Sequence, residues 1–291
     1  MLRPATCAVR RAARAASSAL RSNRHAASSV LTNAFTQRLS PGDPRRDCSA
    51  AFRDLSTSTK KTENTEANRS LQEDAGVPTV FDPRVGELLE LIEESRAEGD
   101  SEQELKQSLE LYGLLKQRNQ QDAEVFEVAF GIARIHDDQL EDGETATKYY
   151  EEALEILEAI STEATAWGAY MRVTTLGALA VCHENIGQSE EAAKYFEDAI
   201  GAYEEHCDQA STLGDDEADV SSSDVSLLAD LNATAAMIHY HYTGNLLAQD
   251  RWDEAKTVTK IALELAENSS MPAEDLEELQ HCVHELWLEM D

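Results

Sequence analysis

The chain has 291 residues, of which 25 are Lys or Arg and 56 are Asp or Glu, so its formal net charge is −31. This surplus of negative charge repels phosphate backbones and argues against binding to nucleic acid. The five cysteines lack the spacing of a disulfide framework or a zinc ribbon, so the chain is neither a small disulfide-rich domain nor a small zinc-binding domain.

The charge changes sign near the N-terminus. Residues 1–61 contain 12 bases and three acids, a net charge of +9, whereas the rest of the chain contains 13 bases and 53 acids, a net charge of −40. On a helix, Arg3, Arg10, Arg14 and Arg21 fall within roughly 40° of one another, opposite a modest apolar stripe. This composition is typical of an organelle transit peptide, and its apolar stretches are too short for a secretory core or a membrane span.

The segment AFRDLSTSTKKT, residues 51–62, lies where the sign changes. Arg53, Leu55 and Ser56 in it resemble the mitochondrial processing pattern of an arginine, any residue, a bulky residue and then a cut before small hydroxyl residues. We therefore predict that residues 1–55 are a presequence, removed before Ser56, and that the protein works in mitochondria, in the matrix. A plastid peptide and a basic tail that binds nucleic acid are the alternatives.

Beyond this segment, the pattern predicts a disordered linker over residues 56–81 and a helical domain over residues 82–291. Gly99 separates the first two expected helices, and Ser101 with Glu104 predicts a capping box at the start of the second. No alternation typical of strands follows residue 80. The apolar positions expected to face the core are Val85, Leu88, Leu89 and Ile92, then Leu105, Leu109, Tyr112 and Leu115.

Three later stretches repeat one pattern, a helix, a polar turn and a second helix with a small, a large and a small residue at steps of four and three. These residues share one helix face, and small residues on the first helix, Ala133 and Ala180, let the paired helix approach closely. A single pair cannot bury its own apolar face, so the pairs must stack. The repeated triplets are Ala146, Tyr150 and Ala153, then Ala192, Phe196 and Ala199, then Ala255, Thr259 and Ala262.

These residues resemble tetratricopeptide repeats, most closely in the middle stretch, where Leu176, Leu179, Gly187 and Phe196 also match the family pattern. Two departures are Thr259 in place of an aromatic and one extra residue between Ala133 and Leu140. The long spacing is similar to that of kinesin light chains and of a mitochondrial tetratricopeptide protein of respiratory complex III assembly. The resemblance implies an all-α fold, a right-handed superhelical solenoid of stacked antiparallel helix pairs.

The recognisable repeats cover about residues 132–267. Between the second and third repeats, residues 208–224 lack an apolar period and predict a mobile acidic loop. After the repeats, apolar residues at steps of three and four over residues 272–290 predict a helix that caps the solenoid. A helix that binds a partner would show the same stripe.

Patterns that carry chemistry are weak or incomplete. There is no glycine-rich phosphate loop, and Leu288 stands where a zinc protease motif starting at His284 needs its second histidine. The Cys and His neighbours are poor chelates, since adjacent helical residues point about 100° apart. We expect no catalytic residue, no metal and no cofactor. An enzyme that uses these Cys and His residues with a bound metal is the remaining alternative; they are Cys182 and His183, His206 and Cys207, His281 and Cys282, and His239 and His241.

The family resemblance instead implies a binding surface, because the first helix of each pair lines the concave side of such arrays. Only Arg134 and Asn185 fit a clamp for the carboxylate of a chaperone tail, so chaperone binding is disfavoured. The net charge favours a basic protein or peptide, although acidic helices are also simply soluble. The predicted groove residues are Arg134, Asp137, Glu184, Asn185, Tyr240 and His241, with Val181 and Gly244 between them.

The sequence thus predicts a protein without chemistry of its own that holds a partner in mitochondria. We expect an assembly factor for a respiratory-chain complex, with complex III as the first case, because of the family resemblance. The alternative is a stoichiometric structural subunit of a respiratory complex, the ATP synthase or the mitochondrial ribosome. Without a transmembrane segment, contact with the inner membrane would go through a partner.

Overall fold

The computed structural model describes residues 83–119, 122–160, 165–213 and 222–290, and within these ranges the chain is helical without a β-strand. The predicted presequence and the linker over residues 56–81 lie outside the described residues. The helices are α4 (Pro83–Glu98), α5 (Ser101–Arg118), α6 (Ala123–Arg134), the π-helical turn η1 (Ile135–Gln139), α7 (Gly143–Ala159), α8 (Ala166–Asn185), α9 (Ser189–Leu213), α10 (Ser222–Ala248), α11 (Trp252–Glu267) and α12 (Ala273–Met290).

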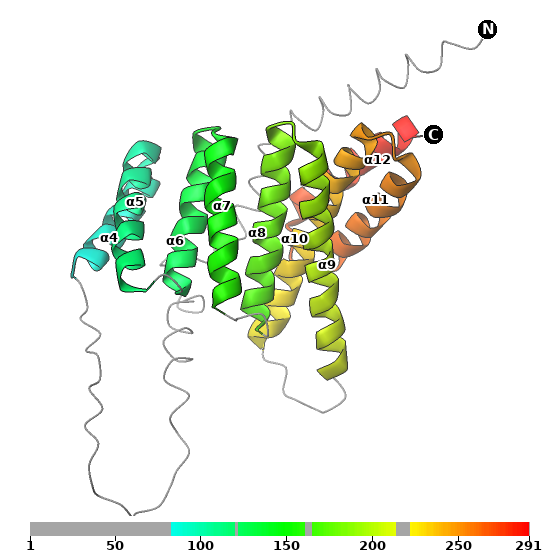
Figure 1. Ribbon diagram of the computed structural model, residues 1–291. Coiled ribbons are helices and arrows are strands. Elements are labelled where there is room, and N and C mark those ends of the chain that lie inside the picture. The colour runs from blue at the N-terminus through cyan, green and yellow to red at the C-terminus, as the bar shows by residue number, and fades with distance from the viewer. Residues whose placement is uncertain (1–82, 120–121, 161–164, 214–221, 291) are drawn as a thin grey trace, which may run out of the picture.

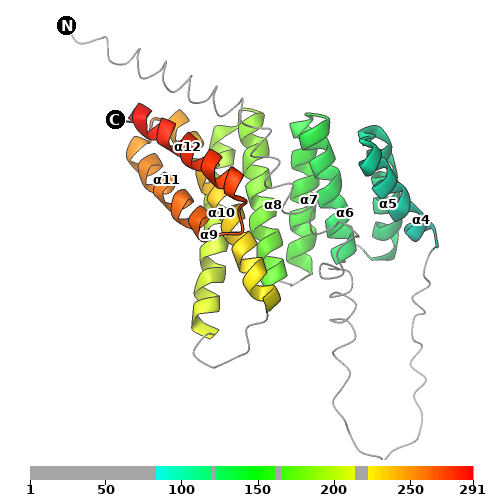
Figure 2. The same cartoon turned by 180° about the vertical axis from the view of Figure 1, so that it is seen from behind.

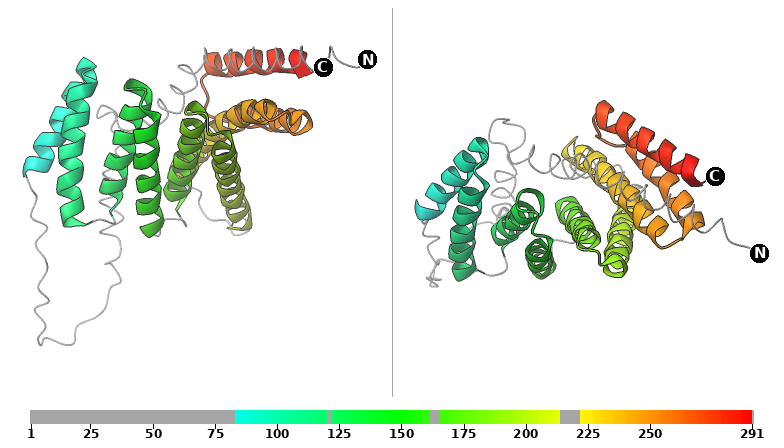
Figure 3. Two further views of the ribbon diagram at one scale, coloured as in Figure 1. Left: turned by 45° about the horizontal axis from the view of Figure 1, so that its top comes forward. Right: turned by 90° about the horizontal axis from the view of Figure 1, so that it is seen from above.

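The helices form antiparallel pairs that stack side by side. Helices α4 and α5, α6 and α7, α8 and α9, and α10 and α11 pack as hairpins, and α12 packs on α11 at the end of the array (Figures 1 and 2). Seen from above, the pairs follow an arc, with α6, α8 and α10 toward its inner side and α7 and α9 toward its outer side (Figure 3). The fold is therefore an all-α solenoid of the tetratricopeptide type, as predicted.

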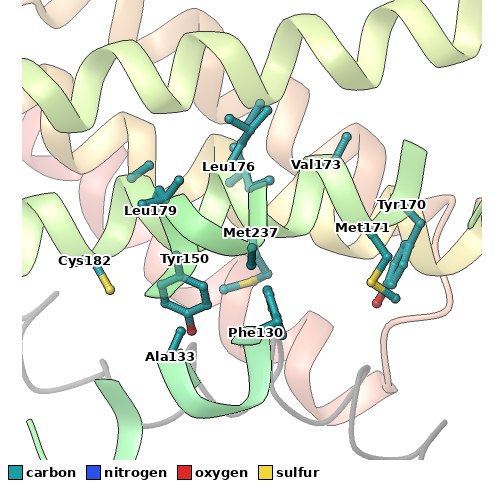
Figure 4. Packing of buried hydrophobic residues seen from close by; sticks show 14 of the residues in the cluster. Phe130, Ala133, Tyr150, Tyr170, Met171, Val173, Leu176, Leu179, Cys182 and Met237 are labelled. Carbon is teal, nitrogen blue, oxygen red and sulfur yellow. The ribbon is translucent and has the colours of Figure 1, made fainter. Parts of the chain in front are cut away.

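The repeated small and large residues form the core. All nine residues of the three predicted triplets are at most 2% exposed, and Ala133 and Ala180 are fully buried opposite them. The Tyr150 ring lies 5.2 Å from the Phe130 ring, close to Ala133 (Figure 4). The departure at Thr259 also fits, because its hydroxyl donates to the Ala255 carbonyl over 2.6 Å and lies 3.1 Å from the Thr243 hydroxyl. Two small polar residues thus close a gap that an aromatic ring fills in the other pairs.

The extra residue after Ala133 is accommodated without a break in the helix. It widens the last turn of α6 into η1, where the Leu140 N–H donates to the Ile135 carbonyl over 3.1 Å, across five residues. Such π turns absorb single insertions in helices and often occur at functional sites. Here the wide turn carries Asp137 and Asp138.

The first hairpin differs from the prediction in its helix cap and in its buried face. Asp100, not Ser101, caps α5, because its side chain accepts from the Gln103 N–H over 3.1 Å. Leu109 is 39% exposed while Leu111 is buried, so the core stripe of α5 is rotated from the predicted one. Leu89 of α4 is likewise exposed. The short apolar runs of this hairpin satisfy more than one helical face, and contact with α6 selects one.

The predicted acidic loop over residues 208–224 is helical at its two ends. Helix α9 continues to Leu213 and α10 begins at Ser222, which leaves only residues 214–221 outside the described structure. A formed helix gains one hydrogen bond for each added residue, which favours the continuation of α9 through this polar stretch. Serine and aspartate, which open the α10 sequence, are favoured at helix starts. The last helix, α12, packs on α11. None of the helices that the structure describes is long and apolar enough for a membrane span.

Candidate functional site: the inner face

The inner face is the side of the array formed by α6 with η1, by α8 and by α10. Its polar residues come from the first half of α6, from η1, from the last turn of α8 and from the second half of α10. Contacts between them join η1 to α8 and α8 to α10, so the face is continuous across three hairpins. Four carboxylates define its chemistry, and we call them the inner-face carboxylates: Glu127, Asp137, Asp138 and Glu184.

The π turn places two of these carboxylates next to each other. The Asp138 Oδ2 lies 3.8 Å from the Arg134 Nε, a loose ion pair. Asp137 instead accepts a hydrogen bond from the thiol of Cys182 on α8. Burial, with the negative charge of Asp138 beside it, raises the pKa of Asp137 to about 6. Asp137 is thus a carboxylate that would gain from a nearby cation.

Glu127 lies one seven-residue step before Arg134 and therefore on the same side of α6. Its pKa is raised to about 7, first by burial and then by the charges of Glu124 and Asp122. In the folded protein, its charged form is therefore disfavoured at neutral pH. Glu127 is not among the predicted groove residues, although its helical spacing from Arg134 is a usable signal in the sequence.

On the inner face, α8 and α10 pack directly against each other. The His241 Nδ1 lies 4.0 Å from the Glu184 Oε2, at the edge of an ion pair. Tyr240 and His241 are only 6% and 8% exposed. Both belong to the packing between hairpins, so the prediction that they line an open groove has no support from their burial. Asn185 is exposed at the end of α8.

The structure thus brings together some of the predicted groove residues. Glu184 meets His241, and Tyr240 and His241 pack with their rings 5.8 Å apart. Arg134 and Asp137 instead make contacts with residues that were not predicted, Asp138 and Cys182. The π turn explains this difference, because it rotates the residues after Arg134 relative to a regular helix.

The Cys and His neighbours are directed to different partners. Cys182 contacts Asp137, whereas the His183 Nδ1 lies 2.7 Å from the Gln188 Oε1 and its ring stacks on Tyr195. Burial raises the pKa of Cys182, which makes its thiol a poor nucleophile. Among the described residues there is no group of three or more His, Cys, Asp or Glu side chains placed to hold a metal ion.

A separate pocket of about 250 Å³ lies between the start of α8 and the second half of α9. Its lining includes three small residues, Gly168, Ala169 and Ala202. Also in the lining, the Arg172 Nη1 lies 4.0 Å from the Glu205 Oε2. The two opposite charges leave the pocket without a clear preference for an anion or a cation.

The comparison with protein families agrees with this geometry. The tetratricopeptide repeat model matches residues 173–206, which run from the middle of α8 into α9. A separate comparison with curated proteins finds no match. The chain therefore contains a tetratricopeptide repeat within a solenoid of the same architecture. Because such repeats are protein interaction modules, the match indicates a scaffold for protein binding.

Proposed function

We propose that this protein is a mitochondrial scaffold that binds a basic segment of a partner protein on its inner face. The inner-face carboxylates carry this proposal. Arg134 forms a loose ion pair with Asp138, and burial raises the pKa of both Glu127 and Asp137. A Lys or Arg side chain placed there would restore the charged form of these carboxylates and so gain more than at an exposed acidic surface.

The place of action is proposed from the sequence. The basic, Arg-rich segment before Ser56 and the processing pattern at Arg53 and Leu55 support import into the mitochondrial matrix. Matrix-facing loops of membrane complexes are candidates for the basic segment that is bound. We further propose that the protein is an assembly factor for a respiratory-chain complex, with complex III as the first to test because of the long repeats.

A permanent subunit of a large complex is the second candidate. It is favoured by exposed apolar side chains at the two ends of the array, Leu89 and Leu109 on the first hairpin and Trp287 and Leu288 on α12. Such side chains suit a lasting interface. An assembly factor would co-purify in substoichiometric amounts, whereas a subunit would match its complex one to one.

The test is affinity purification of the tagged protein from isolated mitochondria, with quantitative mass spectrometry of every co-purifying chain and of the bait's N-terminus. The key variant combines Glu127→Gln, Asp137→Asn, Asp138→Asn and Glu184→Gln. A matched control removes the same charge from exposed positions of the outer helices: Glu155→Gln, Glu158→Gln, Glu191→Gln and Asp198→Asn.

We expect the inner-face variant to lose the partner and the control to keep it, with an N-terminus at or near Ser56. Equal loss in both variants would show that total charge, and not the inner face, holds the partner. An intact Met1 would remove the basis for the mitochondrial location. The stoichiometry of the captured complex separates the two candidate functions.

A further inference from the structure

The pocket between the start of α8 and the second half of α9 offers a second site, separate from the inner face. On α9 its lining follows one side of the helix, because Ala202, His206 and Gln209 succeed one another at steps of four and three. On α8 it includes Gly168 and Arg172, which are four residues apart. A glycine on one helix and an alanine on the other leave a gap between them, so the cavity belongs to the packing of this hairpin.

The size of the pocket limits its ligand to a small molecule. The volume of about 250 Å³ corresponds to roughly eight water molecules, at about 30 Å³ for each in the liquid. Pockets that hold drug-sized ligands measure roughly 300–1,000 Å³. A nucleotide or a similar large cofactor is therefore a poor fit, and a molecule of about ten or fewer non-hydrogen atoms is a good one.

The pocket carries one positive and one negative side chain. The Arg172 Nη1 lies 4.0 Å from the Glu205 Oε2, which is too far for a direct hydrogen bond. The Glu205 Oε1 accepts from the Gln209 Nε2 over 3.3 Å, so this carboxylate is oriented from its own helix. The side chains of Arg172 and Glu205 are 35% and 62% exposed, so a ligand from solvent can reach both charges.

The ends of the two helices add partial charges of both signs. Gly168 and Ala169 belong to the first turn of α8, which begins at Ala166, and the start of a helix carries a partial positive charge. Gln209 lies one turn before the end of α9 at Leu213, and the end of a helix carries a partial negative charge. Because α8 and α9 run antiparallel, both poles lie beside the same pocket (Figure 1).

A ligand with a single charge would meet a like charge in this pocket. An anion beside Arg172 would lie near Glu205, and a cation beside Glu205 would lie near Arg172. A molecule with both a carboxylate and an ammonium group avoids this conflict. Its carboxylate accepts from the Arg172 guanidinium, and its ammonium group donates to the Glu205 carboxylate, which gives two charge-assisted hydrogen bonds.

We propose that this pocket binds a free α-amino acid with a short side chain, which lies against Gly168, Ala169 and Ala202. Such a ligand bridges the two helices of one hairpin and so stabilises that hairpin. None of the residues that line the pocket is an inner-face carboxylate, so this proposal goes beyond the proposed function and does not depend on it.

The experiment records ¹H–¹⁵N NMR spectra of the full-length protein during titration with L-alanine, propionate or ethylamine. Propionate lacks the ammonium group of L-alanine, and ethylamine lacks its carboxylate. We expect L-alanine to shift the amide signals of Gly168, Ala169 and Ala202, with a Kd on the order of 1 mM because the charged side chains are partly exposed. At equal ionic strength, propionate and ethylamine should bind roughly tenfold more weakly, because each leaves one charged side chain without its partner.

Three variants separate this pocket from general effects of charge. Ala202→Leu fills the pocket and should abolish the shifts caused by L-alanine, with circular dichroism as the check of its fold. Glu205→Gln, at an exposed side chain, tests the site without filling it; it should bind L-alanine roughly tenfold more weakly and no longer prefer L-alanine to propionate. Glu191→Gln removes the same charge from an exposed position near the start of α9 and should bind L-alanine as the wild-type protein does.

Equal shifts by the three ligands, or no shift by L-alanine, would overturn this inference. A preference for L-alanine over propionate that survives in Glu205→Gln would do the same. Shifts that persist in folded Ala202→Leu would place the ligand elsewhere and refute the assignment to this pocket. Each of these results leaves the proposed function of the inner face intact, since that function is tested by the loss of a protein partner.

Discussion

The substitution Glu127→Gln should stabilise the folded protein, and more so as the pH rises. Burial raises the pKa of Glu127 to about 7 from an ordinary value of 4.5. Below pH 4.5 the side chain is neutral in both the folded and the unfolded chain, so its ionisation does not lower the free energy of unfolding. Between pH 4.5 and 7 the unfolded chain loses this proton first, and folding must either keep the proton or bury the charge. Stability therefore falls over this range, and a neutral glutamine removes the loss.

The size of the effect follows from the difference in pKa. One pKa unit corresponds to about 1.4 kcal/mol, so Glu127→Gln should raise the free energy of unfolding by about 3 kcal/mol at pH 8 and by about 1 kcal/mol at pH 5. For a domain of this size, 3 kcal/mol corresponds to a rise in Tm of roughly 6–12 °C. Desolvation is the largest cause of the raised pKa, so added salt should change the difference little.

The assay is urea denaturation of residues 56–291, followed by circular dichroism at pH 5 and pH 8, for the wild-type protein and for Glu127→Gln. Glu155→Gln, at an exposed position on α7, is the matched control and should differ little from wild type at either pH. A stabilisation by Glu127→Gln that is equal at both pH values would refute the reasoning, because an effect of packing or helix propensity does not depend on pH. So would a variant less stable than wild type at pH 8.

Three further substitutions test the packing, with the same denaturation assay as the measurement. Gly177→Ala should destabilise by about 1–3 kcal/mol, because a Cβ there would lie 2.8 Å from Ile238 of α10; an unchanged midpoint would mean that α8 and α10 are less closely packed. Glu141→Gly should stabilise by about 1 kcal/mol, since Glu141 has a φ of 53° in the turn before α7, and a loss would show that its side chain matters more than its backbone. Thr165→Ala should cost about 1 kcal/mol, because Thr165 Oγ1 accepts from the Gly168 N–H over 3.0 Å, whereas Thr165→Ser should retain most of the stability.

The candidate site could be predicted only in part. The resemblance to tetratricopeptide repeats, in which the first helix of each pair lines the concave side, identified Arg134, Asp137 and Glu184, and Glu184 does face a neighbouring hairpin through His241. Sequence spacing did not reveal that Asp137 contacts Cys182, because that contact depends on the width of one helical turn. Nor did it reveal that Tyr240 and His241 are buried, since their burial comes from helices distant in the sequence.

The sequence by itself determined the helical pairs and their core. A small residue, a large one and a small one at steps of four and three can pack only against a close partner helix, and all nine such residues are buried. It also determined the opposite charges of the two parts of the chain, because charge depends on composition alone.

Only the tertiary structure decided which of several apolar faces the first hairpin buries, so that Leu111 lies inside and Leu109 outside. It also decided which carboxylates have raised pKa values. Burial is a property of the assembled array, since the dielectric around Glu127 and Asp137 is set by helices that the local sequence does not specify.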